Sequence, residues 1–209
     1  ETSARAAILS RIRATNVRVD AGTCVPEYQG IERSYQQTAS MDRAEILQMF
    51  TERLHEYDAH VHEATAATLA ATIGEALKTN GQKSAVIASD FPRQHLPEGF
   101  FWQQESAATT DELNTAEGAI CSSEVAIAHT GTIIIKDARE LSLLPDRLLC
   151  VVYDHQVVET VPEAFARLQQ FASEPLTFIS GPSATADIEM TRIRGVHGPR
   201  FLDVILVKN

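Results

Sequence analysis

The stretch from Phe178 to Val207, FISGPSATADIEMTRIRGVHGPRFLDVILV, guides how we interpret the rest of the chain. A short apolar run ends in a tight turn at 180–183 (SGPS), and a second turn at 195–199 (GVHGP) leads into the last apolar run. Between the turns, residues 184–190 favour a short helix with Ser183 as its N-cap. We therefore predict a strand, a turn, a helix, a turn and a strand in that order.

Two glycine turns this close together favour a ligand site, because glycine tolerates positive φ and lets backbone approach a ligand. Free N–H groups at the start of the predicted helix would attract an anion. The ligand-binding residues that we predict here are Ser180, Gly181, Ser183, Thr185, Gly195, His197, Gly198 and Arg200. A turn with a purely structural role is the alternative.

Two other features point to an anion. Arg192, Arg194 and Arg200 form a local cationic cluster, and the forked guanidinium group suits a carboxylate or a phosphate. A solvated strand edge is the alternative for these arginines. A further glycine turn lies between two apolar runs in AIAHTGTIII, where we predict a hairpin or a bulged strand. The hydroxyl and amide groups of Thr130, Gly131 and Thr132 would complete the site.

Composition bounds the class of protein. The 209 residues are 44% hydrophobic and 22% charged, so one α/β domain can bury a sizeable core. A net charge of -10 argues against nucleic acid and against anionic membrane surfaces as partners. Cys24, Cys121 and Cys150 are far apart and odd in number, which predicts a reducing compartment. No signal peptide is visible, and no apolar run approaches the roughly 18 residues of a transmembrane helix.

The first part of the chain has a helical pattern. Residues 2–14 predict a short amphipathic helix, and residues 16–41 predict an extended arm or loop. Apolar residues then step by three or four over 41–79, which predicts a long helix with a break near 66–71.

The second part has short apolar runs separated by turns. We predict strands at 85–88, 118–121, 125–128, 133–136, 148–153, 176–179 and 201–207, and helices near 111–116 and 160–171. Alternating strands and helices imply an α/β fold with a mostly parallel sheet, helices on both faces and a ligand at the carboxyl ends of the strands. We expect one domain, in which a helical segment and arm (1–80) pack on an α/β core (81–209).

The motifs leave catalysis open. The run 181–185 (GPSAT) invites comparison with the G-x-S-x-G nucleophile elbow. Its fifth position is threonine, and Asp187 and His197 follow too soon to be delivered by separate strands, which argues against a serine hydrolase. His197, Asp187 and Glu189 are our candidate catalytic residues, and the sequence assigns the role to none of them.

We predict no metal site in this chain. His55, His60 and His62 lie among glutamates in the expected long helix, where an offset of five puts His60 on another face from His55. His55 and His62 would stand two turns, roughly 10 Å, apart. The cysteines lack C-x-x-C spacing, so we expect no iron–sulfur cluster in this chain either.

Taken together, the motifs resemble the lactate utilization protein C family, which contains the LUD domain. The stretches SGPSATADIE, GVHGPRFLDVILV, AIAHTGTIII and LSLLPDRLLCVV carry the resemblance, which covers about residues 84–207 strongly. The family often has an acidic residue before Thr-Gly-Thr, where this chain has His129.

The resemblance implies a fold like the glucosamine-6-phosphate deaminase, ribose-5-phosphate isomerase and CoA-transferase group. It also implies a role in oxidising L-lactate to pyruvate in the bacterial cytoplasm, alongside two partner proteins that carry iron–sulfur clusters. We therefore expect a subunit or accessory protein that binds a small carboxylate or a phosphate-bearing ligand at its glycine turns. The alternatives are a free-standing isomerase or transferase acting on a sugar phosphate or acyl-CoA, and a binding module without chemistry.

Overall fold

The computed structural model describes residues 4–15, 28–186, 192–195 and 197–208. The chain divides into two units, Glu1–Tyr35 and Gln36–Asn209. The first unit holds α1 (Ala4–Thr15), which confirms the helix predicted over 2–14. In the same unit, the Arg33 guanidinium lies 4.7 Å from the centre of the Tyr28 ring. The second unit contains all the sheets described below.

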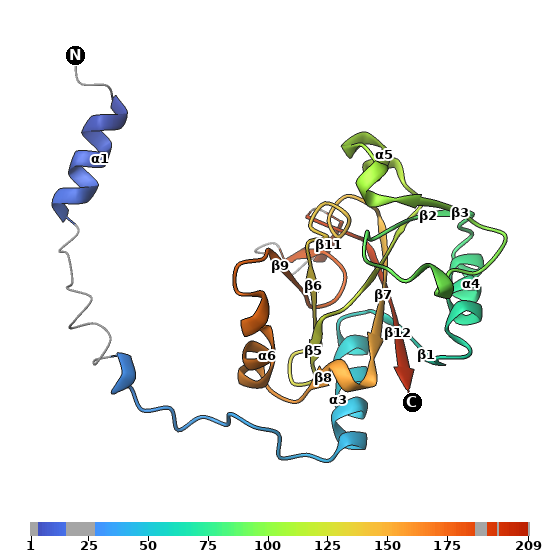
Figure 1. The fold of residues 1–209 in the computed structure, drawn as a ribbon, viewed down its shortest axis with the longest axis horizontal. Helices are drawn as coiled ribbons and strands as arrows, with labels where there is room; N and C mark the ends of the chain where they lie inside the picture. Colours follow the sequence, from blue (N-terminus) through green and yellow to red (C-terminus); the bar gives the residue numbers. More distant parts are fainter. Residues whose placement is uncertain (1–3, 16–27, 187–191, 196, 209) are drawn as a thin grey trace. The chain divides into compact units, whose positions relative to one another are not determined.

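A six-stranded parallel sheet forms the centre of the second unit (Figure 1). Its strand order is β1-β12-β7-β4-β2-β3. The strands are β1 (His60–Thr65), β2 (Ser84–Ile87), β3 (Phe101–Gln104), β4 (Ala119–Ser122), β7 (Arg147–Tyr153) and β12 (Phe201–Lys208). Strands β7 and β12 are apolar along nearly their whole length, as expected for parallel strands covered on both faces. The predicted α/β class with a mostly parallel sheet is confirmed.

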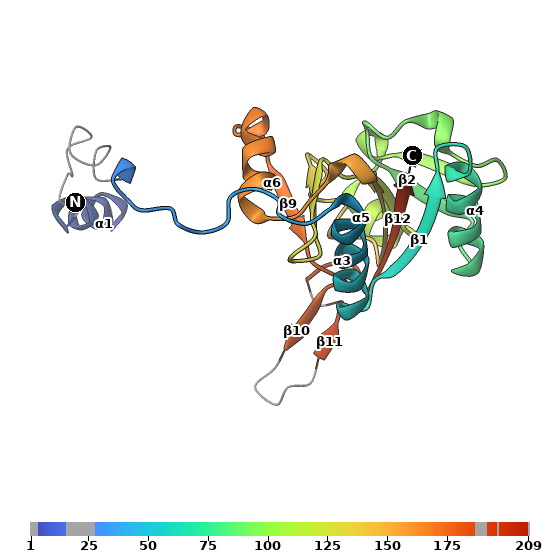
Figure 2. The same ribbon diagram turned by 90° about the horizontal axis from the view of Figure 1, so that it is seen from below.

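A second sheet of four strands has the order β8-β5-β6-β9. Its strands are β5 (Val125–Ile127), β6 (Thr132–Lys136), β8 (Val157–Val158) and β9 (Leu176–Ile179). Strands β5 and β6 are antiparallel, so the turn through Gly131 is the predicted hairpin. A third pair, β10 (Ala184–Ala186) and β11 (Arg192–Arg194), is antiparallel and projects from the second unit (Figure 2).

Helices cover both sheets. Helix α3 (Arg43–Glu56) buries Ile46, Phe50 and Leu54, and Asp42 caps its first turn. Helix α4 (Leu69–Thr79) packs on the large sheet over β1 and β12, and α6 (Val161–Leu168) packs on the small sheet over β5 and β8 (Figure 1). The second unit also has α5 (Thr110–Thr115) and the short 3-10 turns η1 (Arg93–His95), η2 (Glu105–Ala107), η3 (Asp154–Gln156) and η4 (Gln169–Phe171).

The small sheet separates two apolar cores, because its alternate residues face opposite sides. Ala126, Ile133 and Ile135 join α3 and the large sheet in the main core. Val125, Ile127, Ile134 and Val158 face the other way and pack with α6 in a smaller core. Both faces of this sheet are therefore buried, which explains its uninterrupted apolar runs.

The prediction of one long helix over 41–79 was wrong. Helix α3 ends at Glu56, and the chain turns through Asp58, whose φ is 63°. Residues 60–65 then form β1, an edge strand of the large sheet in which only Ala64 is fully buried. Because no continuous apolar run marks this strand, its residues fitted the helical spacing of their neighbours on both sides.

The helix predicted over 184–190 was also wrong where the structure describes it. Residues 184–186 pair with 192–194 as β10 and β11, and residues 187–191 lie outside the described part of the chain. Ser183 therefore does not cap a helix, and the anion seat that we expected from a helix N-terminus is not formed there.

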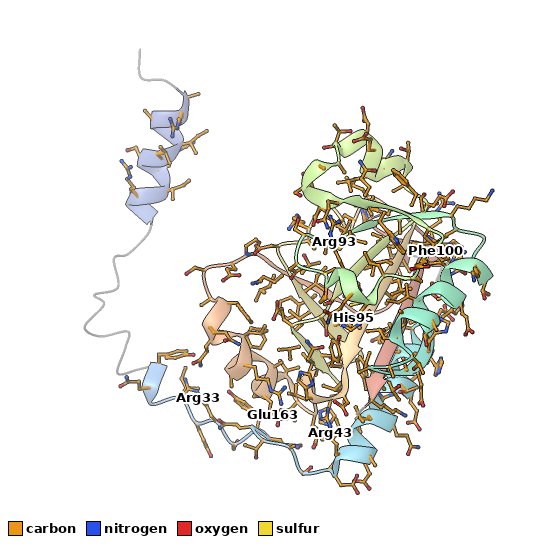
Figure 3. The ribbon with its side chains drawn as sticks, turned by 45° about the vertical axis from the view of Figure 1, so that its right-hand side comes forward. Arg33, Arg43, Arg93, His95, Phe100 and Glu163 are labelled. Atoms are coloured by element: carbon orange, nitrogen blue, oxygen red, sulfur yellow. The ribbon has the colours of Figure 1, made fainter. Side chains whose placement is uncertain are left out.

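The segment that leads into α3 is held by one buried carboxylate. Glu159 is 1% exposed and accepts hydrogen bonds from the N–H groups of Ser40 (2.7 Å) and Met41 (2.9 Å) and from the Gln36 amide (2.6 Å). These bonds, the Met41 N–H first, lower the pKa of Glu159 to about 2. Arg43, labelled in Figure 3, donates to the Val157 carbonyl at 2.6 Å, and burial lowers its pKa. The second unit therefore begins before α3, with residues 36–41 fastened to the small sheet.

Candidate functional site

The first group of predicted site residues comes together through strand pairing. Strands β6 and β9 are antiparallel with Ile133 opposite Ile179, which puts the 130–132 turn beside Ser180. The hydroxyls of Thr130 and Thr132 lie 2.6 Å apart, and those of Thr132 and Ser180 lie 2.8 Å apart. The prediction that these two turns meet is confirmed in space, whereas their role in ligand binding stays a prediction.

Packing against α3 accounts for the glycines in these two turns. Gly131 has φ 57°, and a Cβ there would lie 2.8 Å from the Cβ of Arg53. Gly181 has φ 79°, and a Cβ there would lie 2.5 Å from the Cβ of Tyr57. Both contacts are closer than side chains tolerate. The end of α3, and not a ligand, therefore occupies the space that these two glycines leave.

The second group is organised by Ser183. Its N–H donates to the Pro199 carbonyl at 2.8 Å, and its carbonyl accepts from the Gly195 N–H at 3.0 Å. Its hydroxyl accepts from the backbone N–H of His197 at 3.1 Å. These bonds hold Gly195, His197 and Pro199 against the segment that follows β9 and leave the His197 side chain exposed. Gly195 has φ 78°, a backbone conformation that favours glycine, and the Arg200 side chain passes directly over it.

Two adjoining hollows lie on this second group. The smaller, of about 270 Å³, is lined by Ser142, Leu143, 177–184 and 197–199. The larger, of about 650 Å³, is lined by Asn114, Arg139, Leu143, Leu144, Asp146, Gly195, His197, Gly198 and Arg200. Leu143, His197 and Gly198 line both hollows, so the hollows share a wall. Of the predicted site residues, Ser180, Gly181 and Ser183 face the smaller hollow, and Gly195 and Arg200 face the larger one.

The larger hollow gathers cationic and amide groups in an acidic chain. Arg200 Nε lies 3.4 Å from Asp146 Oδ1, and both side chains are more than half exposed. The Arg139 guanidinium makes no hydrogen bond or ion pair with any residue that the structure describes. His197 and Asn114 add an imidazole and an amide from two other segments. Such a set can bind and orient an anion by charge-assisted hydrogen bonds.

Sequence reasoning missed Asn114 and Arg139. Asn114 lies on α5, and Arg139 lies in the loop between β6 and β7. Neither carries a motif, and only the chain topology brings them beside Arg200. The side chains of Thr185, Arg192 and Arg194, and the candidate catalytic residues Asp187 and Glu189, lie outside the described part of the structure.

These hollows do not lie at the sheet edge where we expected a ligand. Asp146 directly precedes β7 and Arg200 directly precedes β12, so the larger hollow lies at the amino ends of these strands. The carboxyl ends carry a separate hollow of about 210 Å³, lined by Ala88, Ser89, Asp90, Glu105, Lys136, Asp137 and Ala138. It lies beside β2. The chain runs from β2 outward to the edge strand β3 and then back past β2 to β4, so the direction of strand addition reverses at this point.

Two carboxyl groups near this second hollow have perturbed ionisation. Burial raises the pKa of Glu105, and the charges of Asp90 and Glu140 raise it further. Burial also raises the pKa of Glu124, against the opposing charge of Lys136. Glu105 directly follows β3 and Glu124 lies in the two-residue link between β4 and β5, so their place in the sequence was the signal that could have found them.

With this geometry established, comparison with known proteins assigns the family. The family model described as LUD domain matches residues 2–207. The chain belongs to the LUD domain family. A relative from Deinococcus radiodurans, named lactate utilization protein C, is 38% identical over 181 residues, which are 83% of this chain and 84% of that protein.

Two further proteins are similar to this chain in sequence or structure. A Bacillus subtilis protein with the same name is 32% identical over 142 residues, covering 62% of this chain and 58% of that protein. The crystal structure of a DUF162 family protein from Deinococcus radiodurans matches with a TM-score of 0.69 and 34% identity, over 80% of this chain and 99% of that one.

A polar cluster in this LUD domain involves two of the histidines considered above. Asp203 on β12 is buried and lies 3.0 Å from His62 Nε2 and 3.7 Å from His60 Nδ1. Asn80 donates to its other oxygen at 3.2 Å, and Arg147 lies 3.9 Å from that oxygen. Our helical argument about these histidines was wrong, because His60 and His62 lie on one face of a strand. Within the described ranges, no group of three or more His, Cys, Asp or Glu side chains is arranged to hold a metal ion.

We also asked whether any of the described helices could span a membrane. None of those in residues 4–15, 28–186, 192–195 and 197–208 combines the length and the apolar character needed to cross a bilayer.

Proposed function

We propose that this chain is a cytoplasmic subunit or accessory protein of an iron–sulfur-dependent system that oxidises L-lactate to pyruvate. In this proposal it binds a small anionic ligand beside its glycine turns. The names of the relatives from Deinococcus radiodurans and Bacillus subtilis support the pathway. The observation that carries the ligand class is the larger hollow, where Arg139, Arg200 and His197 meet on a chain of net charge -10.

The proposed division of labour between this chain and its partners starts from the chemistry of the reaction. Oxidation of lactate releases electrons that an acceptor must take, and iron–sulfur clusters are held by cysteine thiolates, commonly four. The two cysteines that the structure describes, Cys121 and Cys150, are buried side by side in β4 and β7. They do not fit such a cluster, and in this proposal the clusters lie in two partner proteins. The contribution of this chain is then to bind and orient an anion.

The test is to isolate the tagged protein from its own host grown on L-lactate. We expect iron-bearing partners in the eluate and lactate-dependent reduction of a dye. The same isolation from cells grown without lactate, and one with an untagged protein, are the controls. Recovery of the protein alone, without iron and without dye reduction, would contradict the proposal.

A second candidate function has its own observation. Glu105 and Glu124 stand near the carboxyl-end hollow with raised pKa values, which suits proton transfer by an isomerase or transferase acting on a sugar phosphate or acyl-CoA. Turnover by the isolated protein, lost in Glu105→Gln and Glu124→Gln but kept in Arg200→Ala, would favour this function. Absence of turnover with both substrate classes would dismiss it.

A further inference from the structure

The two hollows beside the glycine turns have a common wall, and of the two only the larger is lined by arginine side chains. The larger one carries Arg139, Arg200 and the Asn114 amide. The smaller one presents apolar side chains, among them Phe178, Pro182 and Pro199, together with several serine and threonine side chains. A ligand that crossed the shared wall of Leu143, His197 and Gly198 would therefore meet cationic groups at one end and apolar groups at the other.

The size of the hollows also argues against a small carboxylate as their only occupant. A ligand of six heavy atoms, such as lactate, fills roughly 100 Å³, the space of three or four liquid waters. The larger hollow measures about 650 Å³ and the smaller about 270 Å³. Pockets of about 300–1,000 Å³ are typical of drug-sized ligands, which are several times larger than lactate.

The smaller hollow offers a flat aromatic surface, the ring of Phe178. Phe178 is 46% exposed although it lines the smaller hollow, and Leu143 on the shared wall is 38% exposed. The Phe178 ring stacks on Phe165, with ring centres 6.0 Å apart and planes at 25°. A second ring that covers an aromatic surface of this kind contributes favourable binding free energy.

The cationic end favours a phosphate over a carboxylate. Arg200 already lies 3.4 Å from Asp146, so an incoming anion must compete with a carboxylate. A phosphate group carries more charge and three acceptor oxygens, enough to engage Arg200 and Arg139 together.

We propose that the ligand is a phosphate-bearing molecule with a flat aromatic ring, its phosphate in the larger hollow and its ring on Phe178 in the smaller one. This inference rests on the anion site of the proposed function and names the class of its ligand. It does not depend on the partner proteins.

The experiment is calorimetric titration of the full chain with matched probes. Adenosine monophosphate and flavin mononucleotide carry both parts, ribose 5-phosphate lacks the aromatic base, adenosine lacks the phosphate, and L-lactate is the small carboxylate. We expect at least one of the two ring-bearing phosphates to bind tenfold or more tightly than ribose 5-phosphate, adenosine and lactate.

Variants separate the two ends. Phe178→Ala should weaken the ring-bearing phosphate about tenfold and leave ribose 5-phosphate unchanged, whereas Arg139→Ala with Arg200→Ala should weaken both. Phe101→Ala, at a phenylalanine that is 72% exposed and outside both hollows, should change neither. Circular dichroism and thermal melting check that each variant is folded.

Two outcomes would overturn the inference. If ribose 5-phosphate or lactate binds as tightly as the ring-bearing phosphates and Phe178→Ala has no effect, the anion site stands but the ligand class is wrong. If none of the probes binds, or the arginine variants bind all of them normally, the anion site of the proposed function fails as well.

Discussion

Gly131 and Gly181 show how a single residue can look like a ligand contact and serve packing instead. Each has positive φ, and each leaves room for the end of α3. We expect Gly131→Ala and Gly181→Ala to lower the free energy of unfolding by about 2–4 kcal/mol, from left-handed backbone strain together with overpacking. Denaturant titration measures the loss.

Gly99→Ala is the matched control for these substitutions. Gly99 also has positive φ, at 86°, but no atom lies within 4 Å of a Cβ placed there. It should cost only about 1–2 kcal/mol, the strain of the left-handed conformation. Equal losses in all three variants would show that α3 does not set the requirement for glycine.

Glu159 is a second residue with a clear expected effect. Its folded pKa, about 2, is lower than the roughly 4.3 of an unfolded glutamate, so its ionised form stabilises the fold at neutral pH. Glu159→Gln should cost roughly 1–3 kcal/mol at pH 7, the value of hydrogen bonds to a charged group. This difference should be complete above about pH 4.3 and shrink as the pH falls toward 2. A difference that stays constant from pH 7 to pH 3 would contradict the assignment.

At the scale of elements, the sequence predicted seven of the described strands, mistook the residues of β1 and β10 for helix, and missed the short strands β3, β8 and β11. The apolar runs at 148–153 and 201–207 were found because strands buried on both faces leave no other pattern. β1 was missed because an edge strand with one fully buried residue has no such run. β10 was missed because its three residues are defined by pairing with β11, a contact across the turn that local spacing does not report.

The turn that Ser183 holds carries the prediction at this scale. Ser183→Ala removes the acceptor of the His197 N–H and leaves both backbone bonds of residue 183 in place. We expect amide exchange at His197 to accelerate about tenfold or more while the Gly195 amide stays protected, as nuclear magnetic resonance would measure. Unchanged exchange at His197, or equal acceleration at both amides, would show that the hydroxyl does not organise the turn.

At the scale of the whole molecule, the chain order alone could not place the site. Sequence motifs brought Ser183, His197 and Arg200 together correctly, because they are close along the chain. Arg139 and Asn114 arrive from loops and helices that precede other strands, so only the strand order of the large sheet brings them near. The general rule that parallel sheets bind ligands at the carboxyl ends of their strands pointed instead to the hollow beside β2.

The second unit supplies a prediction about where the folded body begins. A chain shortened to start at Gln36 keeps the donors to Glu159, whereas one that starts at Arg43 loses those at Gln36, Ser40 and Met41. We expect the first to unfold at the same denaturant concentration as the full chain, and the second to lose at least as much stability as Glu159→Gln. Equal stability of the two shortened chains would contradict the fastening of residues 36–41.

The most direct test of the central claim asks whether growth on L-lactate requires the arginines of the larger hollow. A host strain that lacks this protein would receive the wild type, the Arg139→Ala and Arg200→Ala double variant, or Lys78→Ala, which changes a cation on α4 outside the hollows. We predict that the double variant, present at wild-type levels, fails to restore growth on L-lactate while the wild type and Lys78→Ala restore it. Growth of the double variant at the wild-type rate would contradict the claim that this hollow serves lactate oxidation.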